Sequence, residues 1–308
     1  MRAIDIEATT QHNTTVQNAD TTSARPHKRS LGLKAIGTAL WSLSTPDEFT
    51  SLKPTHEGQL YRQDNQSGIA PRADIYLPEV KNAPSVVLVH GGGFVIGSRQ
   101  MKPVRFLASE FCRAGYAVCA IDYRLIFRGG DLAKALEDVL AALVWWEKQA
   151  QSYKLDTNRI HLCGISAGAT LSCLAAAKSQ ASFLQSLVCF FGLYDFSALR
   201  GPLAKLFERT LVENADWTKH APMQQELAPI PTLLLHGDAD TLVHDEQAQA
   251  LAARRQSQNL QTELKIYKDQ PHGFMNHVTP VSKEALQDVL GFLGCGNCSS
   301  DDRSPCEP

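Results

Sequence analysis

The sequence predicts an α/β fold in which a mostly parallel sheet carries helices on both faces. Along most of the chain, short apolar runs rich in β-forming residues alternate with longer amphipathic runs, and turn-forming residues separate them. This alternation implies right-handed crossovers between parallel strands. Sheets of this kind bind ligands at the carboxyl ends of their strands. Functional residues are therefore expected in the loops that follow the predicted strands.

The composition excludes several classes of function. Of 308 residues, 30 are Lys or Arg and 32 are Asp or Glu, so the formal net charge is −2 and offers no electrostatic basis for binding nucleic acid or an anionic membrane. No apolar run reaches the roughly 18 residues that span a bilayer, so we expect no transmembrane span. The first 30 residues lack the apolar core of a secretory signal, and most of the eight cysteines lie in apolar runs. We therefore expect a cytoplasmic protein.

The two ends of the chain are expected to lie outside the main domain. Residues 1–30 contain few large apolar side chains and cannot offset the entropy of ordering them, which predicts a disordered arm. Residues 31–56 begin with apolar side chains at helical spacing and predict a lid helix. The main domain is expected over 57–293, with a cap insertion at 194–229. Residues 294–308 predict a disordered tail.

Strands and helices can be placed in order within the main domain. The predicted strands span 59–62, 73–77, 85–90, 117–121, 159–163, 187–191, 232–236 and 263–267. The first two form a hairpin, and turn residues bound each strand. The predicted helices span 104–114, 131–151, 169–177, 245–257 and 282–293. The second of these carries a stripe of leucine and valine at helical spacing, which predicts a face packed on the core.

One motif lies at a predicted strand-to-helix junction. Residues 164–168 read Gly-Ile-Ser-Ala-Gly, the pattern of a nucleophile elbow centred on Ser166. The serine must hold a strained turn with its Oγ exposed, and Gly164 and Gly168 would let strand and helix approach without Cβ clashes. The alternative interpretation is that Ser166 only caps the following helix.

A glycine-rich loop follows an earlier predicted strand. His90 precedes Gly91, Gly92 and Gly93, which have no side chains and would contribute exposed backbone amides. Such amides, together with the amide of Ala167, would form an oxyanion hole. A phosphate-binding loop is the alternative, but it would need Lys and Ser or Thr after the glycines, where apolar residues stand. The position of His90 suits support of the loop better than proton transfer.

A serine nucleophile needs a base and an orienting carboxylate. After Ser166, Asp238 and Asp240 follow one predicted strand and His272 follows the next. This chain order of serine, acid and histidine is the one found in enzymes with a nucleophile elbow. We assign Asp240 as the carboxylate and His272 as the base, and interpret Asp238 as a turn residue that bonds local backbone. Four other histidines are interpreted as structural or surface groups: His161, His236, His244 and His277. None has metal-ligand spacing, so no metal is expected.

Together these pieces resemble the hormone-sensitive-lipase-like esterases of the α/β-hydrolase superfamily over roughly residues 60–293. The matching residues are His90 to Phe94, Gly97, Ser98, Asp122 to Arg124, Asp138, Gly164 to Gly168, Asp240 and His272 to Phe274. The resemblance implies an α/β-hydrolase fold with a small lid and no cofactor. It implies the triad Ser166, Asp240 and His272, the oxyanion donors Gly92, Gly93 and Ala167, and supporting roles for His90, Gly91, Gly164 and Gly168.

The expected function is hydrolysis of a small short-chain acyl ester through an acyl-enzyme. Departures from the family pattern at Ile165, Ala169 and 126–128 leave carbohydrate-acetyl and feruloyl esterases open as neighbouring branches. Amide hydrolysis by an arylformamidase or peptidase-like enzyme is the main alternative. A non-catalytic ligand receptor would usually lack the serine or the histidine, and this chain has both. The sequence leaves a homodimer open, and it shows no second pair of metal ligands near Cys295, Cys298 and Cys306.

Two N-terminal deletions test the predicted lid. Deleting residues 1–30 should leave KM and kcat unchanged, because the arm lies outside the domain. Deleting 1–50 should raise KM or lower the melting temperature, because it removes the apolar stripe expected to pack on 194–229. Steady-state kinetics and thermal unfolding of both variants provide the readout. An unaffected 1–50 deletion would rule out the lid.

Overall fold

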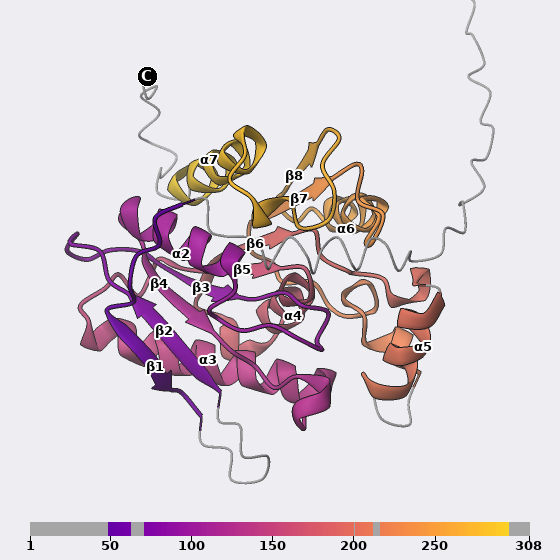
Figure 1. The fold of residues 1–308 in the computed structure, drawn as a ribbon, viewed down its shortest axis with the longest axis horizontal. Helices are drawn as coiled ribbons and strands as arrows, with labels where there is room; N and C mark the ends of the chain where they lie inside the picture. The colour runs from indigo at the N-terminus through magenta and orange to yellow at the C-terminus, as the bar shows by residue number, and fades with distance from the viewer. Residues whose placement is uncertain (1–48, 63–70, 200, 212–215, 296–308) are drawn as a thin grey trace, which may run out of the picture.

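In a computed structural model, the described residues form an eight-stranded sheet at the centre of the protein (Figure 1). Its strands are β1 (His56–Leu60), β2 (Arg72–Tyr76), β3 (Ser85–Val89), β4 (Ala117–Ile121), β5 (Ile160–Ile165), β6 (Leu184–Phe190), β7 (Thr232–Gly237) and β8 (Thr262–Tyr267). The structure describes residues 49–62, 71–199, 201–211 and 216–295. The expected arm, residues 31–48 of the lid segment and residues 296–308 of the tail lie outside these ranges and stay predictions.

The sheet is parallel except at one edge. Its strand order is β1-β2-β4-β3-β5-β6-β7-β8, and β2 pairs antiparallel with both β1 and β4. All pairings from β4 to β8 are parallel. Every residue of β3, β4 and β5 is buried, as expected for strands covered on both faces. The predicted fold class is confirmed, and the predicted hairpin forms the antiparallel edge.

Helices cover both faces of the sheet (Figure 1). One face carries α2 (Lys102–Arg113) and α7 (Pro280–Cys295), and the other carries α3 (Leu132–Ser152), α4 (Ala167–Ala176) and α6 (Glu246–Ser257). Each face has its own cluster of buried apolar side chains. In the cluster beneath α3, the fully buried Trp146 donates its indole N–H to Ser85 Oγ of β3 at 3.0 Å. The indole thus buries its ring without leaving a polar atom unpaired.

The insertion after β6 packs onto the core. It contains the helix α5 (Gly201–Thr210), and its buried apolar residues, among them Leu199, Leu211 and Trp217, join the cluster of α3, α4 and α6. The carbonyl of Leu211 accepts a 2.8 Å hydrogen bond from the amide of Leu132, the first residue of α3. Phe49, at the end of the lid segment, instead packs edge-on against Phe106 of α2 with ring centroids 5.2 Å apart. The insertion and Phe49 are therefore anchored to opposite faces of the sheet.

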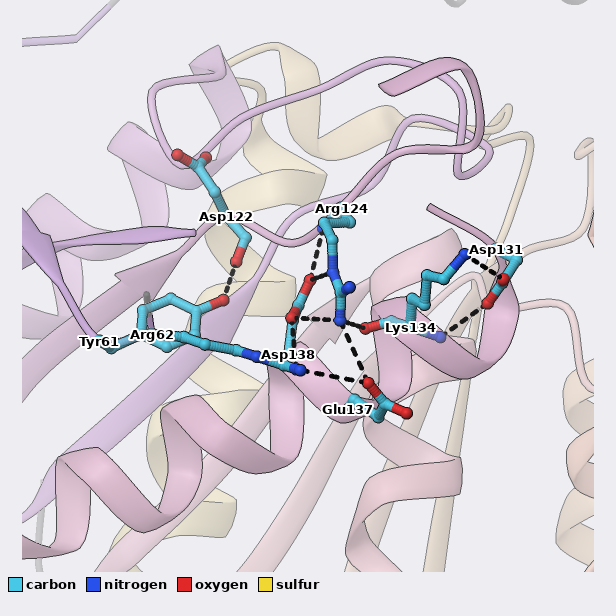
Figure 2. A network of polar contacts seen from close by, with 8 residues as sticks. All are labelled: Tyr61, Arg62, Asp122, Arg124, Asp131, Lys134, Glu137 and Asp138. Carbon is cyan, nitrogen blue, oxygen red and sulfur yellow. Dashed lines mark hydrogen bonds and ion pairs between the residues drawn. The ribbon is translucent and has the colours of Figure 1, made fainter. Parts of the chain in front are cut away.

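A buried carboxylate ties the loop after β4 to α3 (Figure 2). Asp138 is fully buried and accepts three hydrogen bonds from Arg124, through the backbone N at 2.9 Å, Nε at 2.8 Å and Nη2 at 3.0 Å. Arg62 donates to the same carboxylate from Nη1 at 2.9 Å. Glu137, whose side chain is half exposed, accepts from both arginines at the outer end of the network. This network fixes the position of the loop that begins at Asp122.

Replacing Asp138 should destabilise the fold strongly. The Asp138→Asn variant leaves two guanidinium groups without their buried counter-charge, a loss of the kind that costs about 3–5 kcal/mol. The matched control is Glu137→Gln, because Glu137 contacts the same two arginines but is half exposed to solvent. This substitution should lower the free energy of unfolding by less than about 1 kcal/mol. Urea unfolding followed by circular dichroism measures both free energies of unfolding. Equal losses in the two variants would contradict the buried role of Asp138.

Candidate active site

Ser166 stands in a strained turn between β5 and α4. Its backbone has φ 53° and ψ −117°, a conformation that non-glycine residues rarely adopt. A Cβ on Gly164 would lie 2.4 Å from the carbonyl oxygen of Gly168, and a Cβ on Gly168 would lie 2.3 Å from the carbonyl oxygen of Val89 in β3. Only glycine therefore fits at these two positions, and the tight contacts hold the turn. The amide of Ser166 also donates to the carbonyl of Phe190 at 2.8 Å.

The structure brings Ser166, His272 and Asp240 together, although they follow three different strands. His272 Nε2 lies 3.0 Å from Ser166 Oγ, and His272 Nδ1 lies 2.7 Å from Asp240 Oδ2. The Asp240 side chain is fully buried and that of His272 is 11% exposed. Ser166 Oγ makes no capping hydrogen bond to α4, so the alternative interpretation as a helix cap does not hold. The arrangement can pass a proton from the hydroxyl to the imidazole.

The carboxylate of Asp240 accepts hydrogen bonds on both oxygens. Oδ1 accepts from the amides of Leu242 at 2.9 Å and Val243 at 2.8 Å, and Oδ2 accepts from His272 and, at 3.2 Å, from His236 Nε2. Burial by itself would raise the pKa of Asp240. Attraction to His272 and the hydrogen bonds from His236 and His272 outweigh burial and hold that pKa well below its ordinary value. The carboxylate therefore stays ionised beside the imidazole.

Asp238 lies on the outer side of the same loop. It is exposed, and its Oδ1 accepts a 2.6 Å hydrogen bond from the amide of Asp269 in the turn after β8. The sequence predicts a bond to local backbone, whereas the observed partner is 31 residues away in the chain. Asp238 thus joins the loops that carry Asp240 and His272 without contacting the histidine itself.

The glycine loop passes directly beside the elbow. A Cβ on Gly91 would lie 3.2 Å from Ser166 Cβ, so this backbone runs against the serine. Gly92 has φ 115° and Gly93 has φ 60°, and the carbonyl of Gly92 accepts from two amides that follow it, at 3.1 Å each. Within the described part of the chain, the amides of Gly92, Gly93 and Ala167 make no hydrogen bond. These donors, one of them at the N-terminus of α4, remain available for an oxyanion.

His90 supports the shape of this loop from below. Its ring is buried, stacks on Tyr123 with centroids 4.2 Å apart, and contacts the carbonyl of Gly91 through Nδ1 at 2.6 Å. Because a carbonyl only accepts, Nδ1 carries the proton. Burial lowers the pKa of His90 despite the opposing effect of the Gly91 carbonyl, so the ring is neutral. Tyr123 in turn donates to the carbonyl of His90 at 3.1 Å and precedes Arg124 of the buried network.

Two further residues contact the acid and the histidine of the site. His236, interpreted from the sequence as a structural histidine, is fully buried and contacts the Asp240 carboxylate. Phe191 has φ 38° and packs edge-to-face on His272 with ring centroids 4.9 Å apart. A bulky residue directly before Gly192 at a strand end was the only sequence signal for this contact. The ring limits the directions in which the imidazole can turn.

Comparisons with known proteins agree with the fold. A sequence model of the BD-FAE family matches residues 73–254, more than half of the chain. Thermogutta terrifontis esterase 2, solved after phosphonylation by sarin, is 20% identical with a TM-score of 0.69, and the match covers 82% of this chain and 98% of that chain. The same esterase with butyrate bound is 22% identical with a TM-score of 0.64, covering 81% and 97%. Esterase B from Lactobacillus Rhamnosis is 19% identical with a TM-score of 0.70, covering 85% and 91%.

At these identities the solved structures show the fold, which is the predicted α/β-hydrolase fold. The predicted α/β-hydrolase fold is thereby confirmed. In the part of the chain that the structure describes, no helix has both the length and the apolar character needed to cross a bilayer.

The two acids of the loop after β7 should differ sharply in their effect on turnover. Asp240→Asn removes the charge that orients the imidazole and should lower kcat for p-nitrophenyl acetate by ~10⁴, the loss known for a triad aspartate. Asp238→Asn should change kcat little, because Asp238 contacts only a backbone amide. Equal losses would show that the assignment between the two acids is wrong.

Proposed function

This chain belongs to the BD-FAE family, and we propose that it is a serine carboxylic-ester hydrolase acting on short-chain acyl esters. The observation that carries the proposal is the continuous path from Ser166 Oγ through both ring nitrogens of His272 to Asp240, with distances of 3.0 and 2.7 Å. An ionised, buried carboxylate, a histidine within reach of a strained serine, and unpaired amides beside that serine are the parts that acyl transfer requires.

In the proposed acylation step, Ser166 Oγ attacks the ester carbonyl carbon while His272 Nε2 takes the hydroxyl proton. Asp240 accepts a hydrogen bond from His272 Nδ1–H and thereby keeps the imidazole in the tautomer whose Nε2 can take a proton. Its negative charge also stabilises the imidazolium that forms. Negative charge develops on the former carbonyl oxygen, where the amides of Gly92, Gly93 and Ala167 can donate to it. Each such donor contributes typically ~10²–10³ in rate.

Collapse of the tetrahedral intermediate breaks the ester bond to the alcohol. His272 returns its proton to the leaving oxygen, and the acyl group stays on Ser166. Water then takes the place of the alcohol, and its oxygen bonds to the acyl carbon while His272 Nε2 accepts its proton. The second tetrahedral intermediate collapses by breaking the bond between the acyl carbon and Ser166 Oγ, and His272 returns the proton to Oγ, so that the carboxylic acid and free Ser166 result. The cycle needs no group beyond the side chains and amides described above.

The proposed acyl length follows from how the insertion packs. Three of its apolar residues, Leu199, Leu211 and Trp217, are buried in the core cluster of α3, α4 and α6. A small cap of this kind favours short acyl groups. Butyrate bound to Thermogutta terrifontis esterase 2, a protein of the same fold, supports the same size class.

A panel of p-nitrophenyl esters tests the proposal. The wild type should hydrolyse acetate, butyrate and hexanoate esters with higher kcat/KM than the dodecanoate ester, and Ser166→Ala should lower kcat by ~10⁶ while remaining folded. Kynurenine-type formamides and peptide p-nitroanilides, run beside the esters, should be poorer substrates. Faster turnover of an amide would transfer the assignment to amide hydrolysis, and a folded wild type inactive on every ester would contradict the proposed function.

A further inference from the structure

We propose that His236 is a positioning residue that holds the triad carboxylate Asp240 in its working orientation. The inference deepens the proposed esterase function and rests on it. It starts from an unusual feature of the site: Asp240 Oδ2 lies between two imidazoles, His272 Nδ1 at 2.7 Å and His236 Nε2 at 3.2 Å.

The contacts of His236 fix where its proton lies. Nε2 is 2.8 Å from the carbonyl of Val243 and 3.2 Å from Asp240 Oδ2, and both of these oxygens can only accept. Nε2 must therefore carry a hydrogen, which it shares between the two oxygens. Nδ1 is buried and has no hydrogen-bond partner among the described residues. The ring is thus aimed at the carboxylate and the carbonyl.

These bonds close a loop around the carboxylate. His236 Nε2 donates to Val243 O, the amide of Val243 donates to Asp240 Oδ1 at 2.8 Å, and His236 also donates to Oδ2. His236 belongs to β7, a fully buried strand paired on both sides, so it anchors the loop that carries Asp240 to a rigid element. These bonds to β7 fix the plane of the Asp240 carboxylate relative to the sheet, so that Oδ2 points toward His272.

The second donor also divides the negative charge of Oδ2. Among the described residues, the titratable side chains that bond to Asp240 are His236 and His272, while Asp238 bonds to the turn backbone on the exposed side. Without the His236 donor, the whole of the Oδ2 charge acts on His272, and one of the bonds that orient the carboxylate is lost.

Three variants separate positioning from general stability. His236→Phe keeps a planar ring and removes the donor. His236→Gln places an amide N–H near the position of Nε2 and restores the donor. The matched control is His161→Phe, since His161 is a buried histidine of β5, which β6 separates from β7. His161 bonds Ser186 at 2.8 Å and makes no hydrogen bond to the triad among the described residues. If His236→Phe does not fold, His236→Asn replaces it, because its shorter amide ends near the position of Nδ1.

The kcat of each variant is compared with that of the wild type after normalisation to the concentration of reactive active sites. This concentration is measured by titration with a fluorophosphonate. His236→Phe should lower kcat for p-nitrophenyl butyrate about tenfold with KM unchanged. His236→Gln should recover most of the lost kcat, and His161→Phe should keep the wild-type kcat.

Two results would overturn the inference while leaving the esterase function intact. One is a wild-type kcat in the donor-free variant. The other is an equal loss of kcat in the His236→Phe, His236→Gln and His161→Phe variants, which would reduce His236 to a core residue. A folded wild type that hydrolyses no ester would instead contradict the proposed function, and the inference would fall with it.

Discussion

The close approach of three backbones at the elbow is the constraint on which the site depends. Gly168 at the start of α4 lies against the carbonyl of Val89 in β3, and Gly164 in β5 lies against the backbone of α4. Because β3 and β5 are parallel neighbours, their carboxyl ends meet at this point. Ser166 leaves one strand and the glycine loop leaves the other. A side chain at either glycine would separate the serine from the amides beside it.

Buried polar contacts hold in place the loops that surround the turn at Ser166. The glycine loop rests on His90, the ring of His90 rests on Tyr123, and the next residue, Arg124, is fixed by Asp138 of α3. On the other side of Ser166, the carboxylate of Asp240 is held by backbone amides and by His236 of β7. The acid–base pair and the amides are therefore positioned by two separate polar systems. Both are buried, where unpaired polar groups are costly, so each specifies one geometry.

Sequence reasoning succeeded where the signal is local. Apolar runs and turn residues placed most of the strands and helices, although β1 spans His56–Leu60 instead of 59–62 and the helix α5 was not predicted. Each motif could be placed at a strand's carboxyl end because the parallel order followed from alternation. The same reasoning could not find contacts between residues far apart in the chain. Arg62 and Asp138 are 76 positions apart, and no periodicity links them. Likewise His236 and Phe191 resemble ordinary strand-end residues until the fold brings them to Asp240 and His272.

The central claim is that Ser166 forms a covalent acyl-enzyme, and trapping this species tests it most directly. The folded protein would be mixed with diethyl p-nitrophenyl phosphate, digested, and mapped by mass spectrometry. The account predicts one diethylphosphoryl group per chain, carried by the peptide that contains Ser166, and no labelling of the Ser166→Ala variant. An unlabelled wild type, or a label confined to another residue, would contradict it.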